Sequence, residues 1–205
     1  PEFARAAARA AADERGHPGK YVITLARSSI ETFLQFASRR DLREKAFQAW
    51  IARGENGGTT DNRAPIGEMV ALRAERAQLL GFANFADYRL DDQMAKTPQA
   101  ARQLLDEVWG RALTKAAVER DALQAMIAEE GGNFALAPHD WRYYTEKLRK
   151  ARYDLDEAEI KPYFQLDKMI EAAFVTAGRL FGLSFKPIDA ALYHSDARAW
   201  GVTDA

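Results

Sequence analysis

Apolar residues recur along most of this chain at intervals of three and four, which is the period of an α-helix with one buried face. The pattern predicts helices over the ranges 3–15, 28–37, 41–50, 65–80, 85–90, 97–130, 140–153 and 162–181. Short extended segments are expected at 21–25, 183–186 and 197–202, and the first is the best strand candidate because it is rich in β-branched and aromatic residues. The expected fold is therefore mainly α, with one or two short strands.

Several helix ends carry their own signals. Thr97 and Pro98 form a strong helix start, and Gly131 is a natural stop. Ser28 or Ser29 is expected to cap the second helix, and Asp140 to cap the helix at 140–153. The helix after Thr97, with about 33 residues at 1.5 Å each, is a rod of roughly 50 Å. Its predicted buried side is Leu105, Val108, Ala112, Leu123, Met126 and Ile127. Such a rod is too long for a small domain and indicates a scaffold element in something larger.

Composition narrows the function classes. The 205 residues are 47% hydrophobic and 29% charged, with a net charge of −1, so there is no electrostatic reason to expect nucleic acid or an anionic membrane as the main partner. No apolar run approaches the roughly 20 residues of a membrane span. The absence of Cys excludes disulfides and thiolate metal sites and is compatible with a reducing compartment. We therefore expect a cytoplasmic protein that binds neither nucleic acid nor membranes.

The glycine-rich stretch 54–62 predicts an exposed loop between two helices. A phosphate cradle is the alternative, but such loops follow a strand and lead into a helix with a defined glycine pattern. Here a helix precedes the stretch and no Gly-Lys-Ser/Thr follows it, so the loop interpretation is preferred.

Candidate catalytic groups are sparse. The three histidines are His17, His139 and His194, and no two of them have the four-residue spacing of a helical zinc motif. Surface or turn positions are favoured over metal ligation for all three. Acidic pairs are plentiful but are accounted for by solvated helix ends, and a Gly-x-Ser-x-Gly nucleophile elbow does not occur. No residue is therefore assigned to catalysis or to a metal.

The densest feature is an aromatic group, and two interpretations of it stay open. Its members are Trp141, Tyr143, Tyr144, Tyr153, Tyr163 and Phe164. Core packing is favoured on spacing alone, because Tyr and Trp bury large areas while keeping a polar tip for hydrogen bonding. The alternative is a cleft wall that offers rings and hydroxyl groups to a peptide.

At this aromatic group the sequence becomes recognisable. Several ordered blocks resemble the thimet-oligopeptidase family, which includes oligopeptidase A and bacterial peptidyl-dipeptidases. The residues of these blocks are most similar to those of the peptidyl-dipeptidases. The blocks are Asp140-Trp141-x-Tyr143-Tyr144-x-x-Lys147-x-Arg149, Tyr153-Asp154-Leu155-Asp156-Glu157, Lys161-Pro162-Tyr163-Phe164, the segments 53–63 and 72–81, Phe181-Gly182-Leu183-x-Phe185, and Tyr193-His194-x-Asp196-x-Arg198. The resemblance covers essentially the whole chain.

This resemblance implies a helical lobe of a zincin-like zinc metallopeptidase that cuts short peptides in a deep channel, with release of C-terminal dipeptides in the peptidyl-dipeptidase branch. It also implies a zinc ion held by a His-Glu-x-x-His helix and a later Glu, with the motif's own Glu activating water and a later Tyr/His set stabilising the oxyanion. This chain lacks that motif, so no metal ligand is carried over to it. The residues expected to line the substrate cleft are Trp141, Tyr143, Tyr144, Lys147, Tyr153, His194 and Arg198.

We therefore expect residues 1–205 to be a single helical portion of such a peptidase, truncated at both ends and upstream of the zinc motif, with zinc only in the parent. Alone it should be inactive, and its exposed apolar faces should favour self-association. The alternative is a non-catalytic module that binds peptides or proteins on a peptidase-like scaffold. An unrelated all-α structural domain remains if the ordered matches are accidental.

Overall fold

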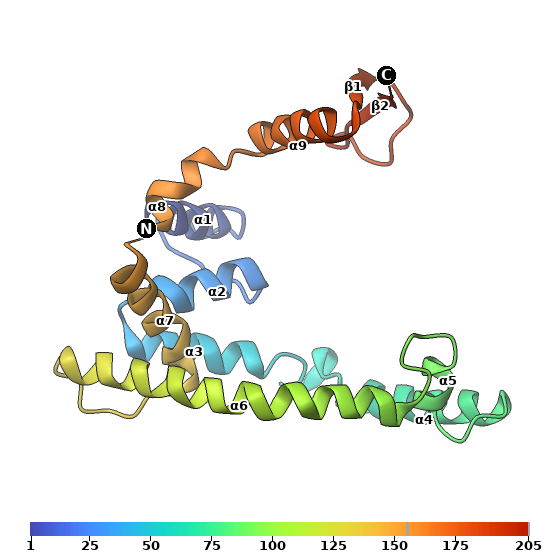
Figure 1. Ribbon diagram of the computed structural model, residues 1–205. Helices are drawn as coiled ribbons and strands as arrows, with labels where there is room; N and C mark the ends of the chain where they lie inside the picture. Colours follow the sequence, from blue (N-terminus) through green and yellow to red (C-terminus); the bar gives the residue numbers. More distant parts are fainter. Residues whose placement is uncertain (155, 205) are drawn as a thin grey trace. The chain divides into compact units, whose positions relative to one another are not determined.

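Residues 1–154 and 156–204 are described by a computed structural model, and helices account for most of their regular structure (Figure 1). Internal contacts divide the chain into two units, Pro1–Tyr153 and Asp154–Ala205, which are treated separately below. The prediction of a mainly α fold with one or two short strands is confirmed.

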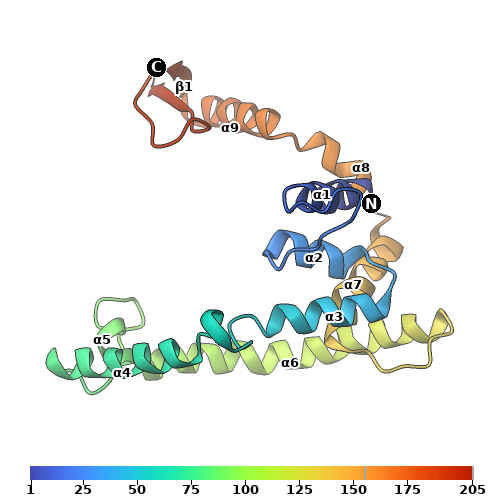
Figure 2. The same cartoon turned by 180° about the vertical axis from the view of Figure 1, so that it is seen from behind.

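All the regular secondary structure described in the first unit is helical. Its elements are α1 Glu2–Asp13, α2 Arg27–Phe36, α3 Arg40–Ile51, the 3₁₀ turn η1 Gly58–Thr60, α4 Arg63–Leu79, α5 Phe85–Leu90, α6 Pro98–Glu129 and α7 Pro138–Tyr153. Both Figure 1 and the reverse view in Figure 2 draw α6 as one unbroken rod. Its 32 residues correspond to about 48 Å.

The ends of α6 follow the sequence signals. The Thr97 hydroxyl accepts a hydrogen bond from the backbone N–H of Ala100 at 3.2 Å, and Pro98 occupies the first helical position. At the other end Gly131 has a φ of 78°, a left-handed conformation that glycine adopts without steric cost. The backbone N–H of Gly132 then donates back to the carbonyl of Ile127 at 2.8 Å. The predicted start and stop of this helix are both confirmed.

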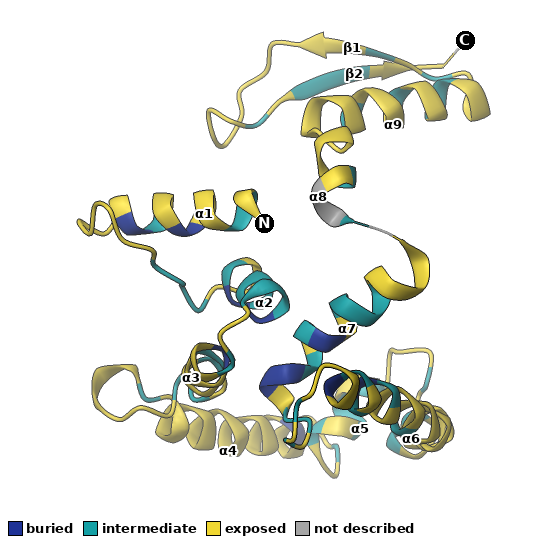
Figure 3. Ribbon diagram, turned by 90° about the vertical axis from the view of Figure 1, so that its left-hand side faces the viewer, coloured by how far each residue is buried: buried dark blue, intermediate teal, exposed yellow. Residues whose placement is uncertain are grey.

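The core of the first unit lies where α2, α3, α7 and the last turns of α6 meet. Ile30 and Leu34 of α2 are buried, and so is the cluster of Leu123, Ile127 and Tyr144 that joins α6 to α7. Figure 3 shows buried residues on α2 and α7, whereas α4 and most of α6 are coloured as exposed. The well-packed part of the unit is therefore the α7 region, not the full length of the long helix.

The second unit consists of α8 Glu157–Ile160, the 3₁₀ turn η2 Lys161–Tyr163, α9 Leu166–Phe181, and the strands β1 Ser184–Ile188 and β2 Ala199–Thr203. The two strands pair in antiparallel fashion, with Ser184 opposite Thr203 and Ile188 opposite Ala199. Phe174 of α9 stacks on Phe185 with 4.2 Å between ring centres. The extended segments predicted at 183–186 and 197–202 are confirmed.

The strand predicted at 21–25 is wrong. This segment belongs to neither a helix nor a strand, although its backbone N–H groups are partly satisfied. The N–H of Val22 donates to the Ala8 carbonyl at 3.0 Å, and that of Thr24 donates to the Ser29 hydroxyl at 3.1 Å. A strand requires a neighbouring strand, and this segment instead bonds to a carbonyl of α1 and to a side chain.

Three predicted helix starts also need correction. The helix α2 begins at Arg27 with Ala26 before it, and Ser29 receives the Thr24 N–H instead of capping the helix. Asp140 lies inside the first turn of α7, which begins at Pro138. Pro162 lies in the 3₁₀ turn η2 and α9 begins only at Leu166. Ser29 and Pro162 take part in a different local bond or turn, and the Asp140 carboxylate bonds to arginines of α3.

Candidate functional site

The most elaborate polar arrangement in the described residues is centred on Asp140 at the start of α7. Its carboxylate is fully buried and accepts hydrogen bonds from two arginines of α3. Arg43 Nη2 donates to Oδ1 at 2.8 Å, and Arg40 Nη2 donates to Oδ2 at 2.9 Å. We call Arg40, Arg43 and Asp140 the Asp140 cluster. It joins α3 to α7 through contacts between residues about a hundred positions apart.

Local structure explains why these groups meet. The carboxylate in the first turn of α7 also accepts the N–H of Ala137 at 3.2 Å, and an acidic group is favourable at the positive end of a helix. Arg43 reaches further, donating to the carbonyls of Ala37 at 2.7 Å and of His139 at 3.3 Å. One buried guanidinium therefore satisfies the end of α2 and the beginning of α7 together.

The electrostatics of Asp140 follow from its partners. Burial by itself raises the pKa of this carboxyl, because a buried charge loses its hydration. Hydrogen bonds from Arg40, Arg43 and the backbone outweigh that effect and hold the pKa of Asp140 below its ordinary value. The carboxylate is therefore ionised at neutral pH and acts as a fixed anion, not as a proton carrier.

Cations and aromatic rings continue from the Asp140 cluster along α7. The Arg43 guanidinium carbon lies 4.2 Å from the ring centre of Tyr143, and Lys147 Nζ lies 5.1 Å from the same centre. Tyr144 meets Tyr143 edge to face, with 5.2 Å between ring centres. Lys147 also forms an ion pair with Glu130, just after the end of α6. This face of α7 is therefore tied to both α3 and α6.

Titration behaviour on this face reflects the balance of burial and charge. Burial lowers the pKa of Lys147, but the hydrogen bond and charge of Glu130 outweigh it, so the pKa is raised above the ordinary lysine value. Burial, with a further contribution from Glu130, raises the pKa of the Tyr144 hydroxyl. Both groups keep their ordinary neutral-pH protonation states, which suits binding and packing more than proton transfer.

The expectation of a surface or turn histidine is wrong for His139. This side chain is buried, and its Nε2 lies 3.6 Å from Asp140 Oδ2 without a hydrogen bond to any described group. His17 and His194 are exposed as expected. The backbone carbonyl of His139 accepts a hydrogen bond from the buried Arg43, so the residue lies beside the Asp140 cluster.

The structure brings only part of the predicted cleft set together. Trp141, Tyr143, Tyr144 and Lys147 share α7 and pack towards α3 and α6, with Trp141 against the Leu123, Ile127 and Tyr144 cluster. The packing interpretation is therefore confirmed for Trp141 and Tyr144. Tyr153, at the end of α7, is 66% exposed. A role of these residues in lining a cleft stays a prediction.

The remaining two cleft candidates belong to the second unit. The His194 Nδ1 accepts a hydrogen bond from the backbone N–H of Asp196 at 3.2 Å. Arg198 donates to Asp167 of α9 at 2.8 Å, and its guanidinium carbon lies 5.5 Å from the ring centre of Trp200. Both side chains are exposed.

Sequence reasoning missed the two arginines and Glu130. On α3 the apolar Leu42 is exposed, whereas the charged Arg43 is buried. A signal was present, because Arg43 stands in the i, i+3, i+4, i+7 series with Ala46, Phe47 and Trp50. A charged residue inside an apolar helical series indicates a buried ion pair, although the series does not identify the partner.

The loop at 54–62 is closed by its own residues. The Asp61 carboxylate accepts the N–H of Gly57 at 2.9 Å, and the N–H of Asn62 donates to the Gly54 carbonyl at 2.7 Å. Hydrogen bonds from Arg63 and the loop backbone lower the pKa of Asp61 to about 2. The carboxylate already occupies a glycine N–H that an incoming phosphate would need, which supports the predicted loop over the phosphate cradle.

Within 1–154 and 156–204, no group of three or more His, Asp or Glu side chains is arranged to hold a metal ion. The residues present therefore do not fit a zinc site. Among the described helices, none combines the length and apolar character needed to cross a bilayer.

Comparisons with known proteins match this chain to one family and to several relatives. The model of Peptidase family M3 matches residues 33–205. A dipeptidyl carboxypeptidase of Escherichia coli (strain K12) is 40% identical over 201 residues, covering 97% of this chain and 30% of the relative. Oligopeptidase A of the same strain is 34% identical over 209 residues, covering 100% of this chain and 31% of the relative.

A third relative is the probable cytosolic oligopeptidase A of Arabidopsis thaliana, which is 34% identical over 205 residues, 95% of this chain and 29% of the relative. The chain thus spans about 30% of the length of the curated relatives that it matches.

Proposed function

This chain belongs to peptidase family M3, and we propose that it forms a helical wall of an oligopeptidase that cleaves short peptides in a channel. The observation that carries the proposal is the family match over residues 33–205, together with relatives named dipeptidyl carboxypeptidase and oligopeptidase A. Release of C-terminal dipeptides is the preferred mode, in line with the name of the 40% identical relative. A cytoplasmic location is part of the proposal and is supported by the name of the Arabidopsis relative.

The proposed work of this chain is to position side chains. The Asp140 cluster and the pair of Lys147 with Glu130 fix α7 against α3 and α6, so the groups on α7 have one orientation. The proposed cleft residues are Trp141, Tyr143, Tyr144, Lys147, Tyr153, His194 and Arg198. Among them, Tyr153, His194 and Arg198 are the most accessible, and we propose that these three contact peptide directly.

Zinc enters the proposal as a cofactor of the parent enzyme. When bound it would polarise the scissile carbonyl and a water molecule. The described residues do not fit a zinc site, so the ligands would come from another part of the polypeptide. It follows that this chain alone should not hydrolyse peptides.

A direct assay tests that statement. The isolated chain is incubated with zinc and a peptide that dipeptidyl carboxypeptidases cleave, and no turnover is expected. Turnover that a chelator abolishes would contradict the proposal.

A replacement experiment tests the cleft role. The matched segment of the E. coli dipeptidyl carboxypeptidase is exchanged for this chain, and dipeptide release is expected to persist. In that chimera, Arg198→Ala and Tyr153→Ala should raise KM, because exposed binding groups are lost. The matched control Arg120→Ala removes an exposed arginine that pairs with its neighbour Asp121, and it should leave KM unchanged. A folded chimera that binds peptides without cleaving them would favour the non-catalytic binding module instead.

A further inference from the structure

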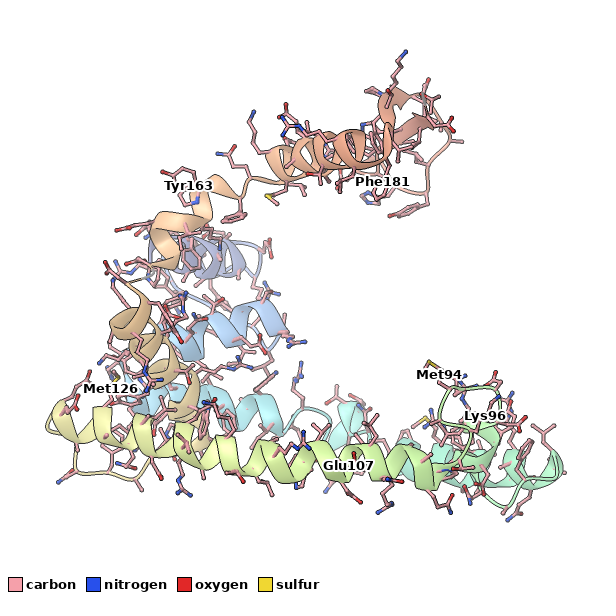
Figure 4. All side chains as sticks on the ribbon, viewed as in Figure 1. Met94, Lys96, Glu107, Met126, Tyr163 and Phe181 are labelled. Atoms are coloured by element: carbon pink, nitrogen blue, oxygen red, sulfur yellow. The ribbon has the colours of Figure 1, made fainter. Side chains whose placement is uncertain are left out.

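The helix α4 and the first half of α6 expose large apolar side chains that no described residue covers. Figure 4 labels Glu107 in this half of α6 and Met126 in the half that packs on α7. We call the exposed part the α4–α6 surface and define it by Ile66, Val70, Leu72, Leu79, Leu105 and Trp109. Many large apolar side chains exposed on two neighbouring segments of this kind indicate an interaction site.

The apolar residues of α4 lie on opposite sides of the helix. At 100° per residue, Ile66 and Val70 point between about 120° and 180° away from Leu72 and Leu79. Val70 is 58% exposed and Leu79 is 80% exposed, so neither side is covered. A helix that is apolar on opposite sides is typical of the interior of a large protein.

The first half of α6 also exposes apolar side chains over a wide arc of the helix. The side chains of Leu104, Leu105, Val108, Trp109 and Leu113 are all more than half exposed and spread over about 180° of the helix. This arc is wider than the stripe of roughly 100° that packing against one neighbour requires. More than one packing partner is therefore needed here too.

The total exposed area points to a partner of considerable size. The chain has a solvent-accessible surface of 15730 Å². Two separate compact proteins with the masses of the two units, about 17 and 6 kDa, would together expose only about 11,300 Å². The excess of about 4,400 Å² is several times the ~800 Å² that one partner contributes to a standard interface. A second copy meeting this chain across one patch leaves most of that excess uncovered.

A depression on α4 indicates which side chains the partner presents. It has a volume of about 360 Å³ and is lined by two arginines, Arg73 and Arg76, together with Pro65, Glu68, Met69 and Leu72. These arginines stack on Phe85 and Tyr88 of α5, and no described carboxylate pairs with either of them. The depression therefore suits an apolar side chain with an acidic residue beside it.

We propose that the α4–α6 surface is an internal docking surface for other helical segments of the same peptidase polypeptide, which pack on both sides of α4. About 70% of the E. coli dipeptidyl carboxypeptidase lies outside the matched segment and is large enough to supply them. The docking segments present apolar faces, and one carries an acidic residue that meets Arg73 or Arg76. This proposal rests on the proposed parent enzyme, but its test is independent of hydrolysis.

The test compares each substitution in two contexts, the isolated chain and the chimera described above. Val70→Asp and Leu79→Asp probe the two sides of α4, and Trp109→Asp probes α6. In the chimera each should lower the melting temperature by about 5 °C or more, because a charge enters a buried interface. In the isolated chain each should change it by less than about 2 °C, because the residue is exposed. Gln78→Asp is the matched control on α4 and should have little effect in both contexts.

A second measurement does not depend on tolerance of a buried charge. The chain has no Cys, so Val70→Cys and Leu79→Cys each introduce a single thiol. In a chimera whose other cysteines are replaced, both thiols should react with a water-soluble reagent at least 10-fold more slowly than in the isolated chain. Equal rates in the two contexts would overturn the proposal. Protection of only one side would overturn the claim that segments pack on both.

Sedimentation of the isolated chain tests the other possible occupant of the surface, a second copy of this chain. A stable dimer that Val70→Asp and Leu79→Asp both dissociate, with unchanged thiol reactivity in the chimera, would assign the surface to a second copy. Failure of the chimera to cleave peptides, with both thiols protected, would instead contradict the proposed function and leave the docking surface intact.

Discussion

The two halves of α6 carry similar apolar residues, but two in the second half are buried and the large ones in the first half are exposed. Leu123 and Ile127, near its end, are buried against α7, whereas Leu105, near its beginning, is 67% exposed. Both halves have helical spacing, and the same rod runs through both. The difference lies in the neighbour: α7 crosses the last turns, and the described residues provide no equivalent layer for the first. An apolar stripe therefore marks what can be buried, and the partner decides what is.

The largest expected loss of stability comes from a substitution in the packed region around α7. Asp140→Ala leaves Arg43 buried without its carboxylate, and loss of one partner of a buried ion pair costs about 3–5 kcal/mol of unfolding free energy. Urea denaturation of the isolated chain measures it. The matched control is Asp121→Ala, which breaks an exposed pair with Arg120 and should cost less than about 1 kcal/mol. Equal losses of unfolding free energy in the two variants would contradict the distinction between the packed region around α7 and the exposed region.

A truncation in each half of α6 tests the comparison directly. Leu123→Ala removes a buried side chain and should destabilise the chain by about 2–4 kcal/mol, because a cavity is left in the core. Leu105→Ala should change the free energy of unfolding by no more than about 0.5 kcal/mol in the isolated chain. A large cost at Leu105 would mean that the first half of α6 is already covered in solution.

Acid should weaken the packed region selectively. Because the pKa of Asp140 is lowered in the folded state, its contribution is fully present above the ordinary carboxyl pKa. That contribution is lost as the pH falls through the lowered pKa of the folded chain. Unfolding free energies measured between pH 5 and pH 2 should therefore fall more steeply for the original chain than for Asp140→Asn. Parallel curves would show that other carboxyl groups dominate acid unfolding.

A modest effect is expected at the exposed beginning of α6. Thr97→Ala removes the hydroxyl that accepts the Ala100 N–H and should cost about 1 kcal/mol. Thr97→Ser keeps the acceptor and should restore most of the stability. Faster amide exchange of the first turn in Thr97→Ala, without a change near Leu123, would sharpen the contrast between the two halves. Acceleration along the whole helix would contradict it.

Local chemistry made several elements predictable from sequence. Thr97 with Pro98, and Gly131 at the far end, define α6 because capping and left-handed glycine are properties of neighbouring residues. The aromatic series on α7 and the two extended segments of the second unit were also predictable, because they too are recognised from residues close together in the sequence. The errors came where a residue was used by a distant partner or a different local bond: the segment 21–25 found no strand to pair with, and Ser29 bonded to Thr24.

The sequence by itself determined the helical class, the long rod, most helix boundaries and the family of the chain. Only the tertiary structure decided that Arg43 rather than Leu42 faces the core, that His139 is buried, and that Asp140 joins α3 to α7. Pairing between residues about a hundred positions apart depends on how helices cross, which local periodicity does not encode. The same limit separates the two halves of α6, since burial is a property of two surfaces and the sequence of a helix describes only one.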